Sequence, residues 1–553
     1  MSAQSSCSRF ILNVITLGLS GVLTACGGGG GGLETSAAFS TNSTASNTPV
    51  APSVSAAVDT VSLKSDSTCA LQYSNLNLAA QIGPDPLFID QWHLRNTGQR
   101  KGLIGEDINV LPAWSISKGA GVQIALVDDA LEITHPDLKA NTVTGASYNY
   151  RGDLKGSAFP LPCSSVDSHG TAVAGIVAAS ASNAIGTVGI APDARIVGYN
   201  ALALDKPADI ADALIRDNQR NAIYNNSWGS PDTGELNEAE PEFVAAIAAG
   251  LKSGRGGLGS VFVFPAGNGG CYLVAGSSGC NVDSANLDGY INQIGVIAVG
   301  SLTNQGKAPW YGERGSNILV SAPAGDSNAG ITTTAISNDY RHDFVGTSAS
   351  TPMVTGVAAL MLAANPKLSW RDVPIILART ARKNDVLDDG WKKGFNHRYG
   401  FGAVDAAAAV KLAQNWISVG DSRSLLSCAT SVTVNANITD DAAPLLTKAA
   451  LSDCAIQQIE YVTVIVNMRH EYSGDLTIDL ISPSGAVSHL ATPRLCESTD
   501  RSVDRCGAFE RWQFGSVRHL DEAALGSWQL MVKDTVAGKT GALLSWTLTA
   551  YGR

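Results

Sequence analysis

Short apolar runs and Ala-rich stretches alternate along the chain from about residue 84 to residue 417. Apolar runs of this length are typical of strands that are buried on both faces of a parallel sheet. They lie at residues 122–127, 195–198, 222–224, 261–264 and 296–299. The Ala-rich stretches between them predict helices at residues 170–182, 207–220, 240–252, 352–364 and 370–382. Strands that alternate with helices predict an α/β domain, with helices on both faces of a parallel sheet.

After about residue 421 the pattern changes to an alternation of apolar and polar positions. It is clearest at residues 461–466 and 476–481, and it predicts strands with one buried face. Turn sequences at residues 482–485 (Ser-Pro-Ser-Gly) and 537–541 (Ala-Gly-Lys-Thr-Gly) separate such strands. We therefore expect a second, all-β domain over residues 421–553, a sandwich or jelly roll.

The chain begins with a segment typical of export. Apolar residues 10–23 follow a single early positive charge and end in Leu-Thr-Ala-Cys. This ending resembles the lipobox of bacterial lipoproteins, which makes residues 1–26 a signal peptide and Cys26 the lipidated residue. An ordinary signal peptide with a chance cysteine is the alternative. The expected location is the outer membrane or the cell surface, where the protein contacts the membrane through its N-terminal lipid anchor.

A low-complexity segment follows at residues 27–83. It starts with six consecutive glycines, and Ser, Thr, Ala, Asn and Pro dominate it to about residue 68. This composition predicts a flexible tether that holds a folded body away from a membrane. The α/β domain then occupies residues 84–420.

Charge and cysteine content narrow the class of protein. The formal net charge of -11 argues against a nucleic-acid partner. Eight cysteines follow Cys26, and an even number in an exported protein favours disulfides. Many connectivities stay open, but proximity in the sequence suggests the pairs Cys271–Cys280, Cys428–Cys454 and Cys496–Cys506, which leaves Cys69–Cys163.

Three polar residues stand where an α/β domain holds its active site. Asp128 follows the first apolar run, whereas the motifs that contain His169 and Ser348 each lead directly into a predicted helix. A Ser hydroxyl needs a base, an imidazole with a pKa near neutrality supplies one, and a buried carboxylate orients that imidazole. Taken singly, the three are explained as a turn Asp, a helix-entry His and an N-cap Ser. Together they predict a Ser-His-Asp hydrolase.

The motifs around these three residues resemble the subtilisin superfamily. They are Leu-Val-Asp-Asp-Ala at 126–130, Asp-Ser-His-Gly-Thr at 167–171 and Gly-Thr-Ser-Ala-Ser-Thr-Pro at 346–352. Other motifs resemble its kexin and furin branch, the proprotein convertases, at residues 85–88, 91–99, 134–138 and 227–229. The β region resembles the P domain of that branch at residues 473–476, 482–485 and 525–530. The resemblance implies a subtilisin-like parallel-sheet domain followed by a jelly-roll P domain.

This resemblance also implies a serine endopeptidase and a substrate preference. It makes Asn268 the side-chain donor to the oxyanion, beside the backbone N–H of Ser348. It makes Asp288 the base of the pocket for the side chain before the cut, and Asp129 an acidic group facing the next position upstream. An extended peptide would pair with the edge segment Ser227, Trp228 and Gly229. Protein or peptide substrates with Arg or Lys, in single or dibasic sites, are the expected partners.

Calcium is the cofactor that the resemblance implies, because hard cations prefer carboxylate and carbonyl oxygens. One set of ligands is Asp232, Asp283 and Glu313, and the other is Asp85, Asp137 and Asn183.

Some features depart from the family pattern. Ala130 replaces the usual glycine after the acidic pair, which implies a negative φ there. Residues 271–282 insert a segment with two cysteines between Asn268 and Asp283, which we expect to narrow access to the substrate cleft. Only a short low-complexity stretch stands before Asp85, where convertases carry a prodomain, so we expect the enzyme to fold without an intramolecular prodomain or with a separate chaperone. A catalytically silent, surface-binding protein with a protease-like body and a ligand-binding β domain is the alternative function.

Overall fold

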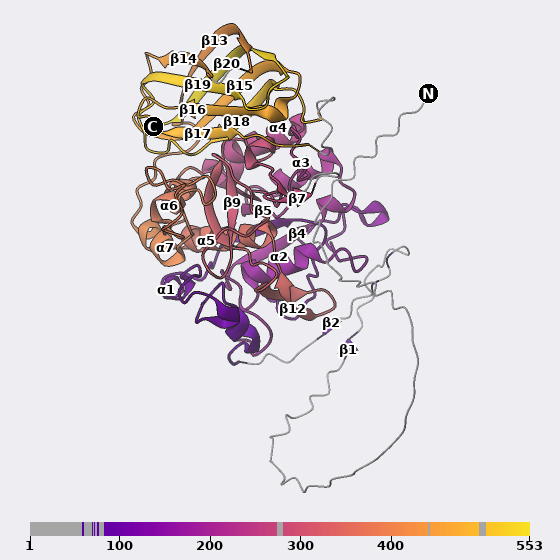
Figure 1. The fold of residues 1–553 in the computed structure, drawn as a ribbon. Helices are drawn as coiled ribbons and strands as arrows, with labels where there is room; N and C mark the ends of the chain where they lie inside the picture. The colour runs from indigo at the N-terminus through magenta and orange to yellow at the C-terminus, as the bar shows by residue number, and fades with distance from the viewer. Residues whose placement is uncertain are drawn as a thin grey trace, which may run out of the picture.

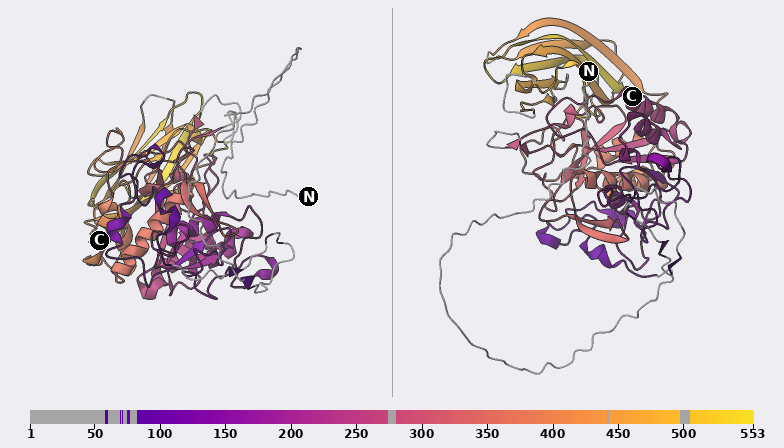
Figure 2. Two further views of the ribbon diagram at one scale, coloured as in Figure 1. Left: turned by 90° about the horizontal axis from the view of Figure 1, so that it is seen from below. Right: turned by 90° about the vertical axis from the view of Figure 1, so that its right-hand side faces the viewer.

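The computed structural model describes residues 82–273, 280–440, 443–496 and 505–553, together with positions 58–59, 69, 71 and 75–76. The predicted signal peptide, the lipidation site Cys26, most of the tether and the side chain of Cys280 lie outside the described residues. The described chain forms an α/β domain and a C-terminal β-sandwich. The sandwich, drawn in orange and yellow, stands on the α/β domain in Figure 1 and in the side view of Figure 2.

A six-stranded parallel sheet forms the centre of the α/β domain. Its strand order is β10-β9-β6-β5-β3-β4, and every neighbouring pair is parallel. The strands are β3 (Gln123–Val127), β4 (Arg195–Tyr199), β5 (Asn221–Asn226), β6 (Val261–Pro265), β9 (Val296–Leu302) and β10 (Ile318–Pro323). All residues of β5, β6, β9 and β10 are buried, as helices on both faces require.

Helices cover the two faces of this sheet separately. The first face carries α1 (Val110–Ala113), α2 (His169–Ala178), α5 (Thr347–Ala364), α6 (Asp372–Thr380) and α7 (Ala406–Gln414). The opposite face carries α3 (Pro207–Ile215) and α4 (Pro241–Ser253). Along β3, Ile124 and Leu126 join the first core and Ala125 and Val127 the second. Successive side chains of a strand point to opposite faces, so one strand supplies both cores.

Helix α5 is apolar and long enough to cross a membrane by length and composition, but its apolar window is 89% buried inside the protein. It is the central helix of the α/β domain. Before it comes a hairpin of β11 (Ile331–Ala335) and β12 (Asp339–Phe344), which packs on α2. Two further short pairs are β1 (Val58–Asp59) with β2 (Asn75–Leu76), and β7 (Tyr272–Leu273) with β8 (Cys280–Asn281).

The C-terminal domain is a sandwich of two four-stranded antiparallel sheets, in the orders β13-β20-β15-β18 and β14-β19-β16-β17. Its strands are β13 (Leu426–Ile438), β14 (Leu445–Leu451), β15 (Ile459–His470), β16 (Leu476–Ile481), β17 (Val487–Ala491), β18 (Glu510–Ser516), β19 (Gly526–Asp534) and β20 (Gly541–Gly552). Buried residues alternate with less buried ones along β16 and β19, which places one face of that sheet in the core. The predicted succession of an α/β domain and an all-β domain is confirmed.

Three predicted disulfides are confirmed. They join Cys69 to Cys163, Cys428 to Cys454 and Cys496 to Cys506. The fourth predicted pair, Cys271–Cys280, depends on a side chain outside the described residues and stays a prediction.

The boundaries of several elements differ from the sequence prediction. Helix α5 begins five residues earlier than predicted, because its first turn lies in the polar Thr347–Ser350 segment, where no apolar periodicity signals a helix. Helices α2 and α3 end earlier than predicted. Strand β10 and helix α7 were not predicted from the sequence.

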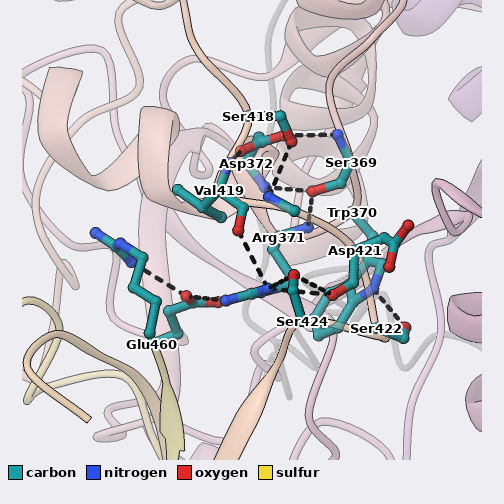
Figure 3. Close-up of polar contacts among 12 residues, drawn as sticks. Ser369, Trp370, Arg371, Asp372, Ser418, Val419, Asp421, Ser422, Ser424 and Glu460 are labelled. Atoms are coloured by element: carbon teal, nitrogen blue, oxygen red, sulfur yellow. Dashed lines mark hydrogen bonds and ion pairs between the residues drawn. The ribbon is translucent and has the colours of Figure 1, made fainter. Parts of the chain in front are cut away.

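The segment between the two domains folds around Arg371, at the start of α6 (Figure 3). The guanidinium donates to Glu460 on β15 at 2.6 and 2.8 Å, and also to the carbonyl oxygen of Asp421 and the hydroxyl of Ser424. The neighbouring Asp372 accepts hydrogen bonds from the Trp416 indole, the Ser418 hydroxyl and the backbone N–H groups of Ser369 and Val419. A buried ion pair therefore holds the linker and the sandwich against the α/β domain.

Candidate active site

The first three candidate residues lie at the end of the parallel sheet where its strands have their carboxyl ends. Asp128 directly follows β3, His169 is the first residue of α2, and Ser348 is the second residue of α5. All three side chains are buried, with exposed fractions of 2%, 4% and 4%. The carboxyl ends of parallel strands and the N-termini of their helices meet at the same edge, which explains how residues far apart in the chain come together.

The imidazole of His169 is held by Asp128. Its Nδ1 lies 2.8 Å from Oδ1 of Asp128, and the ring of Phe344 packs edge-on against it at 5.3 Å between centroids. Burial lowers the pKa of His169, but the charge and hydrogen bond of Asp128 outweigh burial, so the net pKa is raised. The pair thus fixes the ring orientation and stabilises the imidazolium form, as a base in acyl transfer requires.

The hydroxyl of Ser348 donates to the carbonyl oxygen of Ser227 at 3.1 Å. Within the described part of the chain, Nε2 of His169 has no hydrogen-bond partner. Hydrogen bonds between a nucleophile and its base are often long in a free enzyme and tighten when substrate binds. The arrangement leaves Nε2 available to accept a proton.

Asn268 follows strand β6 and is bonded to the start of α5. Its Oδ1 accepts hydrogen bonds from the backbone N–H and the hydroxyl of Thr347, both at 2.9 Å. Because the amide oxygen is engaged in this way, the amide NH₂ points elsewhere and is left to donate. The backbone N–H of Ser348 lies in the first turn of α5, where no intrahelical carbonyl is within reach. Two donors suited to an oxyanion therefore flank the serine.

Asp288 lies beneath the edge segment of Ser227, Trp228 and Gly229, which directly follows β5. Its Oδ2 accepts the backbone N–H of Ser230 at 3.1 Å, and its Oδ1 accepts that of Tyr290 at 2.8 Å. A methyl group at Gly229 would lie only 2.9 Å from Oδ2, so this close approach depends on glycine. Burial raises the pKa of Asp288. The buried carboxylate is therefore held directly against the backbone of the edge segment, and its predicted role in binding the side chain before the cut stays a prediction.

The indole of Trp228 fixes this edge segment to the sheet. Its Nε1–H donates to the carbonyl oxygen of Val127 at 2.9 Å, and its ring packs edge-on against Phe264 and Tyr290. The tryptophan therefore acts from beneath as a support, with only 6% of it exposed.

Asp129 is bonded to the start of α2. Its Oδ2 accepts the backbone N–H of His169 at 3.0 Å, and its Oδ1 accepts those of Gly170 and Ala130 at 2.8 and 2.6 Å. Burial, followed by the charge of Asp128, raises the pKa of Asp129 to about 7. In the structure this carboxylate satisfies the free amides of a helix N-terminus, and its predicted position facing the substrate stays a prediction. The φ of Ala130 is not positive, as predicted.

Comparison with known proteins decides the family. Residues 119–402 match the subtilase family, and residues 459–550 match the proprotein convertase P-domain. The chain is 33% identical over 492 residues to neuroendocrine convertase 2 of Homo sapiens, covering 85% of this chain and 74% of that protein. It belongs to the subtilase family. Its C-terminal sandwich is a P domain.

The chain spans less than two thirds of the length of two further relatives. It is 35% identical over 479 residues to a PC3-like endoprotease variant B of Hydra vulgaris and covers 64% of that protein. It is 35% identical over 480 residues to kexin of Saccharomyces cerevisiae and covers 56% of it. Among solved structures, the serine protease of Aeromonas sobria matches with a TM-score of 0.76 at 26% identity, over 86% of this chain and 96% of that one. A complex of that protease with a chaperone matches with the same TM-score.

The acidic residues Asp232, Asp283 and Glu313 are brought together beside Asn268. The backbone N–H of Asn268 donates to Asp232 at 3.2 Å, and that of Gly269 donates to Glu313 at 2.9 Å. Burial raises the pKa of all three carboxyl groups, that of Asp283 to about 7, and their mutual repulsion adds to the rise in Asp283 and Glu313.

The second predicted set also converges. The amide of Asn183 donates to Asp137 at 2.9 Å, and the backbone N–H of Asn183 donates to Asp85 at 3.0 Å. Burial raises the pKa of Asp137 to about 7. Among the described residues, no three His, Cys, Asp or Glu side chains are arranged so that they could already hold a metal ion. Calcium at either set therefore stays a prediction.

Sequence reasoning missed several residues that support the site. Glu132 is fully buried and its carboxylate accepts the backbone N–H groups of Ser337 and Asn338 at the tip of the β11–β12 hairpin. That hairpin ends in Phe344, the residue that packs against His169. A charged residue in a predicted loop carries no signal of burial, so only the fold identifies Glu132 as a support.

Proposed function

We propose that this subtilase is a serine endopeptidase. Oγ of Ser348 attacks the carbonyl carbon of the scissile peptide bond while Nε2 of His169 takes the hydroxyl proton, and His169 then donates that proton to the leaving amine. Water hydrolyses the resulting acyl-enzyme by the same route, with His169 again as base. The observation that carries this proposal is the 2.8 Å contact between His169 and Asp128, which leaves Nε2 without a partner among the described residues.

Two donors support the oxyanion in this proposal. The NH₂ of Asn268 and the backbone N–H of Ser348 are the groups left free to donate beside the nucleophile. Donors that are fixed before the reaction stabilise charge that develops only in the transition state.

The preferred cleavage is after Arg or Lys, because the buried carboxylate of Asp288 lies directly against Gly229 of the edge segment, where the side chain before the cut would enter. A cationic side chain would compensate for the hydration that the Asp288 carboxylate loses on burial, because the two would form an ion pair. Asp129 adds a second negative charge one position upstream, which favours dibasic sites. Its oxygens are already held by the amides of α2, so its effect is the weaker one.

The test uses the full chain, its Ser348→Ala variant and its Asp288→Asn variant with a peptide library. We expect the wild type to cleave after Arg or Lys and to react with a fluorophosphonate at Ser348. The Ser348→Ala variant should lose about 10⁴-fold or more in turnover without unfolding. Equal cleavage by Ser348→Ala would exclude the mechanism, and an unchanged preference in Asp288→Asn would exclude the specificity alone.

Calcium fits the two acidic sets by the chemistry of their donors. We propose that Asp232, Asp283 and Glu313 hold one ion and that Asp85, Asp137 and Asn183 hold another. A bound cation would offset the repulsion that raises the pKa of the buried carboxyl groups and would fix the loop of Asn268. Added calcium should raise the melting temperature, and Glu313→Gln should reduce that shift, whereas magnesium should give little effect. A melting temperature that is insensitive to calcium and to a chelator would exclude both sites.

Export and folding complete the proposal. The sequence at residues 23–26 supports a lipid anchor on Cys26, which places the enzyme at the outer membrane or cell surface. The Aeromonas sobria protease, which has the same fold, has been solved with a chaperone, which supports a separate folding partner for this chain. We expect Cys26→Ser to move the protein from the membrane to the soluble fraction. Full activity after expression alone would reject the need for a chaperone.

A further inference from the structure

The segment that carries Asp288 lies directly against the P domain. The amide of Asn286 donates to the carbonyl oxygen of Gly515 on β18 at 2.7 Å, and the backbone N–H of Gly515 donates to Oδ1 of Asn292 at 3.0 Å. The side chain of Gln513 adds a hydrogen bond to the carbonyl oxygen of Asn292 at 3.0 Å. Two side chains that flank Asp288 are therefore bonded to one backbone position more than 200 residues away.

Neighbouring polar groups complete this network. The hydroxyl of Ser316 donates to Gly515 at 3.0 Å, and its backbone N–H donates to Oδ1 of Asn286 at 2.8 Å. The amide of Asn317 donates to Oδ1 of Asn292 at 3.0 Å. Asn286, Asn292 and Ser316 are completely buried, and Asn317 is 1% exposed. Buried amides that lose a partner are costly, so these hydrogen bonds hold the backbone of the segment in one conformation.

The close approach at Gly515 depends on the absence of a side chain. A methyl group there would lie 2.0 Å from the hydroxyl oxygen of Tyr461 and 3.2 Å from Cα of Asn292. The position therefore brings the backbone of β18 against the backbone of the Asp288 segment.

A second connection reaches the pocket from its other side. The backbone N–H of Leu236 donates to the carbonyl oxygen of Cys506 in the P domain at 3.0 Å. The adjacent Asn237 bonds through its backbone to Leu287 and Gly289, on either side of Asp288, at 3.0 and 2.8 Å. The backbone on both sides of Asp288 is therefore held by hydrogen bonds that lead to the P domain.

We propose that the P domain completes the specificity pocket, and that Asn286 and Asn292 are positioning residues that fix the carboxylate of Asp288 through Gly515. The inference rests on the proposed function, in which Asp288 binds the side chain before the cut. It assigns to the P domain a part in substrate selection as well as in stability. Asp128, His169 and Ser348 are held by other elements, so the effect falls on recognition of the basic side chain more than on the chemical step.

The experiment measures kcat and KM of the full chain for two peptides that differ only in Arg or norleucine before the cut. We expect Asn286→Ala and Asn292→Ala to lower the preference for Arg about tenfold, mainly through a higher KM. The Gln513→Ala variant removes one hydrogen bond to Asn292 and should lower the preference about two- to threefold. Active-site titration with a fluorophosphonate gives the folded fraction of each variant.

Tyr461→Phe is the matched control at the same interface. The Tyr461 hydroxyl is buried and has no hydrogen-bond partner in the described chain, so its removal should leave the preference unchanged. An unchanged preference in the folded Asn286, Asn292 and Gln513 variants would overturn this inference and leave the proposed endopeptidase intact. A wild type that reacts at Ser348 but shows no preference for Arg would overturn the assigned pocket together with the inference. A wild type that does not react at all would overturn the proposed function itself.

Discussion

The two domains bury their strands in different ways, and their polar groups act at different places as a result. Strands of the subtilase domain such as β5 and β9 are buried along their whole length, so polar side chains that act on a ligand are found at the strand ends. Along strand β13 of the P domain, exposed residues alternate with half-buried ones. Strand β18, at the opposite edge of the same sheet, contributes a backbone position to the other domain. The parallel sheet presents its reactive side chains at the carboxyl ends of its strands, whereas the antiparallel sheet offers its outermost strand for contact with the other domain.

The two cores are also continuous. Tyr461 and Val517 of the P domain belong to the hydrophobic cluster that contains the helices of the subtilase domain. Beside them a cavity of about 40 Å³ lies between the domains, lined by Ile294, Leu319 and Ile375 on one side and by Val517 and Leu520 on the other. The P domain therefore shares a hydrophobic core with the α/β domain and is not an independent attachment.

Truncation after residue 420 should have the largest effect. The fragment would expose the apolar surface that Tyr461 and Val517 cover and would leave Arg371 without its partner Glu460. We expect the 84–420 fragment to be insoluble or inactive, measured by soluble yield, thermal melting and labelling of Ser348. Recovery of a stable and fully active fragment would show that the two cores are separable.

Removal of Glu460 tests the buried pair with Arg371, together with the second contact of Glu460 to Arg553 at 3.1 Å. Glu460→Ala leaves the guanidinium of Arg371 buried without its carboxylate, and this should lower the free energy of unfolding by about 3–5 kcal/mol. Replacement of both partners, as Arg371→Met with Glu460→Leu, should recover most of that loss because no charge is left unpaired. Chemical denaturation measures both, and a single variant as stable as the wild type would contradict a role for the pair.

Asn268→Ala tests the chemistry at the strand ends. Loss of one oxyanion donor typically lowers kcat by about 10²–10³-fold with little change in KM. The hydrogen bonds from Thr347 would also be lost, so the melting temperature should be recorded beside kcat. A variant with unchanged kcat would remove Asn268 from the proposed mechanism.

Acid should destabilise the subtilase domain through His93. This imidazole is fully buried, and within the described chain neither ring nitrogen has a hydrogen-bond partner. Burial lowers its pKa from 6.5 to about 3. The unfolded chain therefore binds a proton that the folded chain excludes, and the free energy of unfolding falls as pH drops from about 6.5 toward about 3.

At pH 5 this loss amounts to about 2 kcal/mol. His93→Gln should flatten the dependence of the unfolding free energy on pH in that window, measured by urea denaturation at several pH values. His342→Gln, at an exposed imidazole, is the control and should keep the wild-type slope. Identical slopes in all three proteins would exclude His93 as the source.

The smallest effect is expected at the exposed ion pair between the domains. Arg379 and Asp521 meet at 2.8 Å, but both side chains are about one-third exposed. Arg379→Ala should lower the free energy of unfolding by less than about 1 kcal/mol, since exposed pairs are screened by solvent and salt. A loss of unfolding free energy as large as that of Glu460→Ala would mean that solvent exposure does not determine how much each interdomain ion pair contributes.

The sequence by itself determined the two-domain fold and the position of Asp128, His169 and Ser348, and it suggested the disulfides Cys428–Cys454 and Cys496–Cys506. Each of these has a local signal: period-two and apolar patterns, cysteine spacing, or a polar residue at the end of a strand or the start of a helix. Such signals can be recognised in the sequence because each depends on residues that are close together in the chain.

Only the tertiary structure decided that Asp129 holds the N-terminus of α2, that Arg371 pairs with Glu460, and that Asn286 and Asn292 meet Gly515. In sequence these are an ordinary acid, a helix-entry arginine, two loop amides and a strand glycine. Their roles come from burial, which makes a polar group depend on one specific partner, and that partner lies tens to hundreds of residues away.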